Sequence, residues 1–178
     1  DRTHQIKAVL ACHVDTSTSI KNDMAALRRA LDQIGHPALL MADCIASMGC
    51  DRFEMDAWGV DLAVTACQKG LMTPPGLGIV IVGPRAREAR PEAPPRSVYW
   101  DWRPRIRPSN FPERFCGTPP THHLFGLREA LDMLLEEGVE NVWTRHRTLA
   151  GAVWACLDAW GEGGELGCHV PEPAHRSW

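Results

Sequence analysis

Lys69 stands between a short apolar run and a rigid turn, where its amine could act as a nucleophile. The run, residues 62–66, has no alternating polar face, which is typical of a strand buried on both faces of a sheet. Residues 74–76, Pro-Pro-Gly, then restrict the backbone behind the lysine. Ligands of open α/β sheets bind at the carboxyl ends of strands, so this position favours chemistry. The alternative is an ordinary solvated lysine, which at its usual pKa of about 10 is protonated and unreactive.

Two further apolar runs end in polar residues that could share a crevice with Lys69. Residues 38–42 lead into Asp43, and the separation from Lys69 fits a strand, a crossover and the next parallel strand. Residues 6–11 lead into a polar stretch that contains Thr16. We therefore expect an amine, a carboxylate and a hydroxyl at one edge of the sheet. The alternatives are a helix N-cap for Asp43 and an ordinary Ser/Thr turn for Thr16.

The elements that would position these residues alternate between strand and helix. The pattern predicts strands over 4–12, 38–43, 62–66 and 78–83, a helix over 23–34 with Asn22 as its N-cap, a connector over 51–59, and a helical piece from Pro84 to Arg90. Gly35 and Pro37 end the first helix. Such alternation is typical of a parallel, doubly wound α/β sheet.

The second half of the chain differs from the first in its composition and its apolar pattern. Residues 91–120 are rich in proline and aromatic residues, which favours an irregular functional or interface loop. Apolar residues then recur at helical spacing from His122 to Glu137 and onward to Gly161. The stripe that they form could be a coiled-coil partner surface, but at this length it indicates simple core packing.

Composition excludes several classes of protein. The 178 residues carry a formal net charge of −3 and are 44% hydrophobic, which favours one globular domain without a nucleic-acid surface. No apolar run approaches the ~20 residues of a membrane span, and the first residues lack the charged-then-apolar layout expected of a signal peptide. The 7 cysteines include no C-x-x-C pair and indicate small buried side chains in a reducing cytoplasm. We expect no metal, since Cys116, His122, His123 and His13 lack the paired spacing of zinc ligands.

Six stretches follow one another in order: His-Val-Asp-Thr-Ser-Thr at 13–18, Asp-Cys-Ile-Ala-Ser-Met-Gly at 43–49, Gln-Lys-Gly at 68–70, Pro-Pro-Gly at 74–76, residues 115–123, and Leu-Arg-Glu-Ala-Leu at 127–131. Together they resemble the class V, fold-type-I pyridoxal-phosphate enzymes, and within these they look most like the alanine/serine–glyoxylate (or pyruvate) aminotransferases. The resemblance implies a three-layer, mostly parallel sheet. It implies that residues 1–137 are part of the cofactor-binding large domain, without its N-terminal portion. Residues 138–178 would be the interdomain helix and the beginning of the small C-terminal domain, so the chain looks like an internal fragment.

The resemblance also implies roles for five residues. Lys69 would bond to the aldehyde of pyridoxal 5′-phosphate and then move a proton between the substrate Cα and the cofactor C4′. Asp43 would keep the pyridine nitrogen protonated. Thr16 would hydrogen-bond near the phenolic oxygen, and Gln68 would contact the phosphate. Thr118 would reach the phosphate of the neighbouring subunit's cofactor, which implies a homodimer.

Two positions depart from the family's pattern. Phe115 stands where relatives often carry a tyrosine, so a phosphate-binding hydroxyl would be lost, and Ser19 stands where a glycine is frequent. The implied activity is transfer of an amino group from alanine or serine to glyoxylate or pyruvate in the cytoplasm. The alternatives are a class V lyase or cysteine-desulfurase-like enzyme, and a non-catalytic truncated fragment that acts only as an interaction domain.

Overall fold

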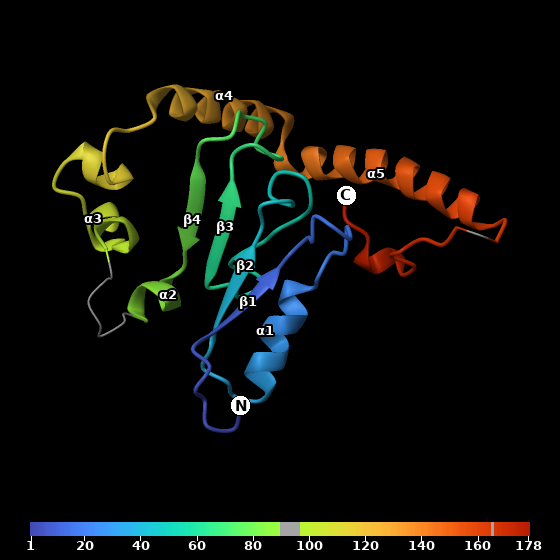
Figure 1. Ribbon diagram of the computed structural model, residues 1–178, viewed down its shortest axis with the longest axis horizontal. Helices are drawn as coiled ribbons and strands as arrows, with labels where there is room; N and C mark the ends of the chain where they lie inside the picture. Colours follow the sequence, from blue (N-terminus) through green and yellow to red (C-terminus); the bar gives the residue numbers. More distant parts are fainter. Residues whose placement is uncertain (90–96, 165) are drawn as a thin grey trace.

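The computed structural model describes residues 1–89, 97–164 and 166–178. Its centre is a sheet of β1 (Ala8–Cys12), β2 (Leu39–Asp43), β3 (Leu62–Ala66) and β4 (Gly78–Val82), in that spatial order (Figure 1). The first three strands are parallel, and β4 is antiparallel to β3. The predicted mostly parallel α/β sheet is therefore confirmed. The predicted features at Arg90 and at prolines 91, 94 and 95 lie outside the described residues.

The reversal of direction at β4 follows from the short connection over residues 67–77. This connection consists of turns, whereas a parallel neighbour needs a crossover of a dozen or more residues, usually with a helix. The Cys67 amide donates to the Leu77 carbonyl at 3.2 Å and so begins the pairing of the two strands. Lys69 consequently lies in the loop of a hairpin at the end of β3.

Helix α1 (Met24–Gln33) packs on one face of the sheet. It begins at Asp23, whose carboxylate accepts a hydrogen bond from the Ala26 amide at 2.8 Å. The predicted N-cap, Asn22, is wrong: its side-chain amide donates instead to the Cys12 carbonyl at 2.9 Å. The buried side chains of this layer are Met24, Leu40, Ala42, Cys44, Val60 and Ala63, and Phe53, Met55 and Trp58 of the predicted connector pack against them.

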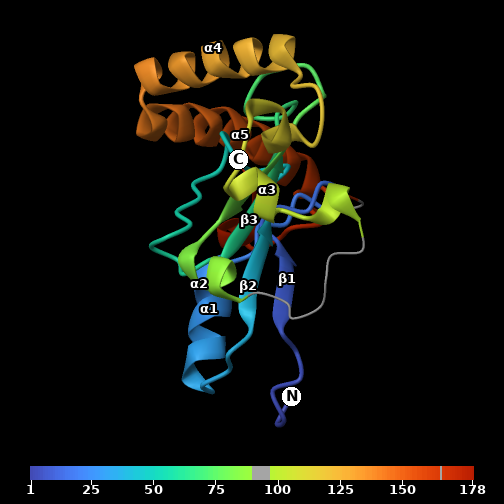
Figure 2. The same ribbon diagram turned by 90° about the vertical axis from the view of Figure 1, so that its left-hand side faces the viewer.

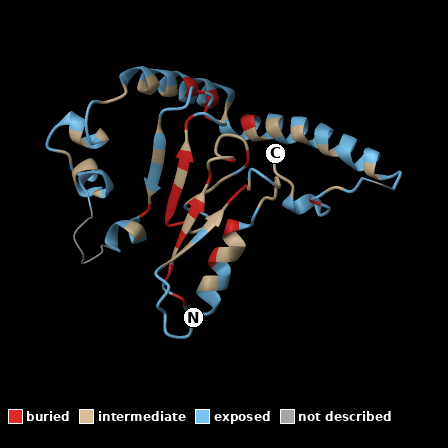
Figure 3. Cartoon of the chain, viewed as in Figure 1, coloured by how far each residue is buried: buried red, intermediate tan, exposed pale blue. Residues whose placement is uncertain are grey.

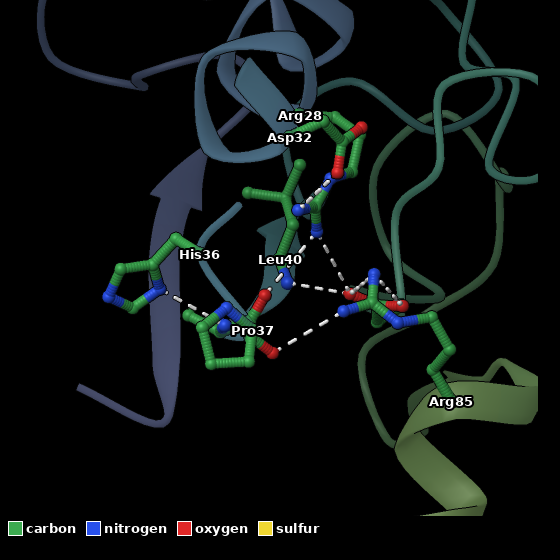
Figure 4. A network of polar contacts seen from close by, with 8 residues as sticks. Arg28, Asp32, His36, Pro37, Leu40 and Arg85 are labelled. Carbon is green, nitrogen blue, oxygen red and sulfur yellow. Dashed lines mark hydrogen bonds and ion pairs between the residues drawn. The ribbon is translucent and has the colours of Figure 1, made fainter. Parts of the chain in front are cut away.

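A network of charged residues closes the amino edge of the sheet, where β2 and β3 begin (Figure 4). The buried carboxylate of Asp61 accepts from the Leu40 amide at 2.8 Å and lies 3.3 Å from Arg85 and 3.7 Å from Arg28. Arg28 also pairs with Asp32 at 2.7 Å. Because its charges are mutually compensated, we interpret this edge as a structural one.

The second half of the chain crosses the carboxyl edge. After α2 (Pro84–Glu88) come short helical turns η1 (Val98–Trp100), α3 (Arg103–Ile106) and η2 (Phe111–Phe115), then α4 (Thr121–Glu137), α5 (Val139–Gly161) and η3 (Pro173–His175). Figures 1 and 2 both show α4 and α5 above the edge at which β3 ends and β4 begins. In Figure 1, α5 extends away from the sheet.

The apolar stripe of the two long helices is largely exposed, so its prediction as simple core is wrong for the described chain (Figure 3). Ala130, Leu134 and Val142 are buried, whereas Leu149, Val153 and Trp160 are 62%, 61% and 65% exposed. The reason is that α5 runs beyond the sheet and meets little of it. The apolar strand β4 is also partly uncovered, with Val80 44% exposed.

The cysteines are unpaired thiols, but not all of them are buried. Cys44 and Cys67 are buried as predicted. Cys116, which directly follows η2, and Cys156, which lies on α5, are exposed. Among the described helices, none combines the length and the apolar character that crossing a bilayer requires.

Candidate active site at the carboxyl edge of the sheet

Three neighbouring parallel strands end together and deliver the predicted site residues to one edge. Cys12, the last residue of β1, is in register with Asp43, the last residue of β2, and Asp43 is in register with Val64 of β3. The ladder continues past the strand ends, since the His13 amide donates to the Asp43 carbonyl at 2.8 Å. The segments that follow these strands, which contain Thr16 and Lys69, therefore leave the sheet on the same side.

Asp43 uses one carboxylate oxygen and leaves the other unbonded among the described residues. Oδ1 accepts from the Ile45 amide at 2.9 Å, which caps a turn over residues 44–50 rather than a helix. The pKa of the neighbouring Cys12 thiol is raised, mainly by burial and secondly by the negative charge of Asp43. Asp43 is thus fixed in place with one acceptor oxygen free for a ligand.

The turn after β2 and the loop after β3 touch at two glycines. A Cβ on Gly49 would lie 2.8 Å from the carbonyl carbon of Gly70, and a Cβ on Gly70 would collide with the Met48 carbonyl oxygen. Gly49 also has φ +88°, a conformation that favours glycine. Since Gly70 directly follows Lys69, this contact brings the lysine loop against the turn that Asp43 begins.

Lys69 lies in the loop at the carboxyl edge, and within residues 1–89, 97–164 and 166–178 its amine has no partner. The sequence contains three lysines, Lys7, Lys21 and Lys69. Lys7 precedes β1 and donates to the His4 carbonyl at 3.3 Å, and Lys21 donates to Asp51 at 3.1 Å. Lys69 is exposed, and its Nζ makes no hydrogen bond or ion pair with the described residues. Gln68 beside it is also exposed.

Thr16 projects from a tight loop that follows β1. Asp15 accepts from the amide and the hydroxyl of Thr18 at 2.8 and 2.6 Å, and its own amide donates to the Ile20 carbonyl at 2.9 Å. The turn does form with Ser19 in place of a glycine, but Ser19 adopts φ +59°. Thr16 itself is exposed, and no described residue bonds its hydroxyl.

Thr118 lies apart from the other four predicted residues. It belongs to the segment between η2 and α4, beyond the edge strand β4 (Figure 1). Phe115, where a tyrosine hydroxyl would be expected, packs its ring against Phe111 with a centroid distance of 5.5 Å. The structure therefore groups Thr16, Asp43, Gln68 and Lys69 and leaves Thr118 outside.

Sequence reasoning missed the groups that hold this edge in place. His13 is buried, its Nδ1 lies 2.9 Å from the Ser47 hydroxyl, and burial lowers the pKa of its imidazole. His123, expected to be a capping or surface residue rather than a metal ligand, donates from Nε2 to the Pro75 carbonyl at 3.2 Å and so supports the turn behind Lys69. The apolar neighbours of His13 in the sequence were a signal of its burial; for His123 the sequence offers none.

The donor set fits pyridoxal phosphate. The Lys69 amine, a free carboxylate oxygen of Asp43 and the Thr16 hydroxyl lie at one edge, and within the described part of the chain none of the three is ion-paired. An aldehyde-bearing pyridine needs a nucleophilic amine, a carboxylate partner for its ring nitrogen and a hydrogen-bond donor for its phenolic oxygen.

Comparison with known proteins gives a consistent result. The family model described as "Aminotransferase class-V" matches residues 2–175. The L-aspartate–glyoxylate aminotransferase of Paracoccus denitrificans is 45% identical over 161 residues, which cover 90% of this chain and 40% of that protein. The serine–glyoxylate aminotransferase of Arabidopsis thaliana is 42% identical, with the same 90% and 40% coverage.

Solved structures resemble the chain over nearly all of its length. An alanine–glyoxylate aminotransferase from Nostoc sp. has a TM-score of 0.83 at 28% identity and covers 99% of this chain and 45% of its own. A pyridoxamine–pyruvate aminotransferase from Mesorhizobium loti has a TM-score of 0.78 at 32% identity, with 99% and 44% coverage. The chain thus spans less than half the length of the proteins that it resembles.

Proposed function

Because this chain belongs to the class-V aminotransferase family, we propose that it carries the catalytic lysine of an enzyme that transfers an amino group from alanine or serine to glyoxylate or pyruvate, with pyridoxal 5′-phosphate as cofactor. The observation that carries the proposal is the free amine of Lys69 on a loop packed against the turn that Asp43 begins. Relatives named for serine, aspartate and alanine share glyoxylate as acceptor. The donor should therefore be assayed with all three amino acids.

Each residue has a distinct task in this proposal. When bound, the cofactor supplies an electron sink that makes the substrate Cα acidic. Lys69 would hold the cofactor through its aldehyde and would be the group that moves the proton at Cα. The free oxygen of Asp43 would accept a hydrogen bond from the pyridine nitrogen and favour its charged form. Thr16 would donate to the phenolic oxygen, and Gln68 would donate to the phosphate.

We also propose the domain and subunit arrangement that this chemistry requires. Residues 1–137 would belong to the cofactor-binding domain, and residues 138–178 to the interdomain helix and the start of a smaller domain. The break at Gly138, with φ +85°, and the departure of α5 from the sheet support that boundary. Thr118, which lies beyond β4, would serve the cofactor of the second subunit of a homodimer. The unpaired thiols support a cytoplasmic location.

The identity of the nucleophile can be tested directly. Pyridoxal phosphate added to the full-length protein should give an absorbance band in the visible range, and borohydride reduction should leave a cofactor-derived mass on one peptide. Only three lysines compete within this chain, so peptide mapping assigns the label. We expect it on Lys69, and Lys69→Ala should abolish it while Lys7→Ala does not. A label retained in the Lys69→Ala protein would overturn the proposal.

A further inference from the structure

An ion pair between a buried carboxylate and a partly exposed lysine lies at the base of the loop that carries Thr16. Asp51 is 1% exposed, and its Oδ1 accepts from Lys21 Nζ at 3.1 Å. Its Oδ2 accepts from the Trp178 amide at 3.0 Å, and Lys21 Nζ lies 4.1 Å from the centroid of the Trp178 ring. Hydrogen bonds to both carboxylate oxygens offset the cost of burying Asp51, whereas the Lys21 side chain is 19% exposed. The pair therefore holds its surroundings in one arrangement.

The backbone on either side of Lys21 ties the Thr16 loop to the end of the chain. Val14 and Lys21 form an antiparallel bridge, so residues 14–21 make a small hairpin with Thr16 at its tip. The outer strand of this hairpin pairs with a second segment: Ile20 bridges Arg176, and the Lys21 amide donates to the His175 carbonyl at 2.7 Å. The hairpin is thus held between strand β1 and the segment 173–178.

Asp51 connects the same hairpin to the turn that Asp43 begins. The Asp51 amide donates to the Ser47 carbonyl at 2.8 Å, which places Asp51 at the end of that turn. Ser47 in turn lies 2.9 Å from the buried His13, at the base of the hairpin. One ion pair therefore joins the two segments that present Thr16 and Asp43.

The hairpin needs such external support. Ser19, close to its tip, has φ +59°, a conformation that residues other than glycine rarely adopt. The segment 173–178 is itself anchored to α5, because Arg176 contacts both carboxylate oxygens of Asp158 at 2.6 Å. The Trp154 indole also donates to the Ser177 carbonyl at 3.0 Å. A rigid chain of contacts thus runs from α5 to the Thr16 hairpin.

We propose that Lys21 and Asp51 are positioning residues for the cofactor site, whose ion pair fixes the Thr16 hairpin relative to Asp43. The inference rests on the proposed function for its ligand. Neither residue touches the cofactor: Lys21 acts through the hairpin backbone, and Asp51 acts through the turn after β2. Lys21 is consequently a lysine with a structural task, distinct from that of Lys69.

The test uses the full-length protein with Lys21→Met, which keeps an unbranched apolar side chain and removes the charge, and with Asp51→Asn. Lys7→Met is the matched control, because Lys7 is exposed and lies before β1. In cofactor-free protein, hydrogen exchange should accelerate at the amides of residues 14–22 and remain unchanged in α4. The dissociation constant for pyridoxal phosphate should rise about 3- to 30-fold, with the KM for the amino donor unchanged.

The outcomes separate this inference from the proposed function. Lys21→Arg, which restores the charge, should recover most of the affinity, and the double variant should be no weaker than Asp51→Asn alone. Folded Lys21→Met protein with unchanged exchange in the hairpin and unchanged affinity would overturn the positioning role. Wild-type protein that binds no pyridoxal phosphate, while the variants still show faster exchange, would overturn the proposed function and support the hairpin role.

Discussion

Two residues at the carboxyl edge have opposite relations to water. Lys69 is exposed and unpaired among the described residues, so its amine is available to a ligand. His13 is 1% exposed and is enclosed by Ser47, Phe53 and Trp58. Burial disfavours the charged form of an imidazole, and the pKa of His13 accordingly lies below its usual value. At the same strand ends, the exposed Lys69 is therefore available to react, whereas the buried His13 stabilises the fold.

The buried His13 predicts how folding stability depends on pH. Burial lowers the pKa of His13, Lys21 acts in the same direction, and Asp51 opposes them. In the unfolded chain the imidazole titrates near its ordinary pKa of about 6.5, so between that pH and the lower pKa of the folded state the unfolded chain binds the proton more strongly. Stability is therefore fully present above about pH 6.5 and is lost as the pH falls toward the lower folded pKa, by at most about 1.4 kcal/mol per pH unit.

Urea unfolding between pH 7.5 and 5 measures this contribution. His13→Gln should flatten the pH dependence of the unfolding free energy, because glutamine takes up no proton in this range. His122→Gln is the control, since His122 is exposed at the start of α4. Equal slopes for the wild type and the His13→Gln protein would contradict the assignment.

At the scale of elements, the site depends on how closely two loops approach. The turn after β2 and the loop after β3 meet through Gly49 and Gly70 with no room for a side chain. Gly70→Ala should push the Lys69 loop away from the Asp43 turn, because the added methyl meets the backbone oxygen of Met48. Overpacking of this kind costs about 1–3 kcal/mol. We expect lower unfolding free energy and slower reaction of Lys69 with pyridoxal phosphate.

Gly78 provides the matched control for this prediction. It begins β4, and a Cβ built on it meets nothing within 4 Å. Gly78→Ala should therefore leave both the stability and the lysine reaction near their wild-type values. Comparable losses in the two variants would show that the β3–β4 hairpin as a whole, rather than the contact between the loops, controls the lysine.

The sequence predicted elements well wherever the signal was local. The apolar run without a polar face is β3, and the proximity of Asp43 to the Lys69 loop follows from parallel strands that end at one edge. The helix start was misplaced because Asn22 and Asp23 both cap helices, and the choice depended on the distant Cys12 carbonyl. The Lys21–Asp51 pair could not be predicted for the same reason, because the two residues are far apart in the sequence and meet only in the folded chain.

The whole molecule presents apolar side chains that a protein of this size would normally cover. Leu10 is 77% exposed on the face of the sheet opposite α1, and Phe125 on α4 is also 77% exposed. Helical periodicity predicted the apolar stripe of α4 and α5, but such periodicity carries no information about what covers a stripe. Large exposed apolar side chains are typical of contact with further protein, which agrees with the proposed homodimer.

A shared site predicts that two defective subunits can complement each other. In the proposed dimer, Lys69 serves its own subunit's cofactor and Thr118 serves the partner's, so Lys69→Ala and Thr118→Asp proteins should each be inactive alone. After subunit exchange, half of the dimers are mixed, and in each of these both defects fall on one site and leave the other intact. The mixture should regain about a quarter of the wild-type activity. If Thr118 served its own subunit, every site in a mixed dimer would carry one defect, and no activity would return.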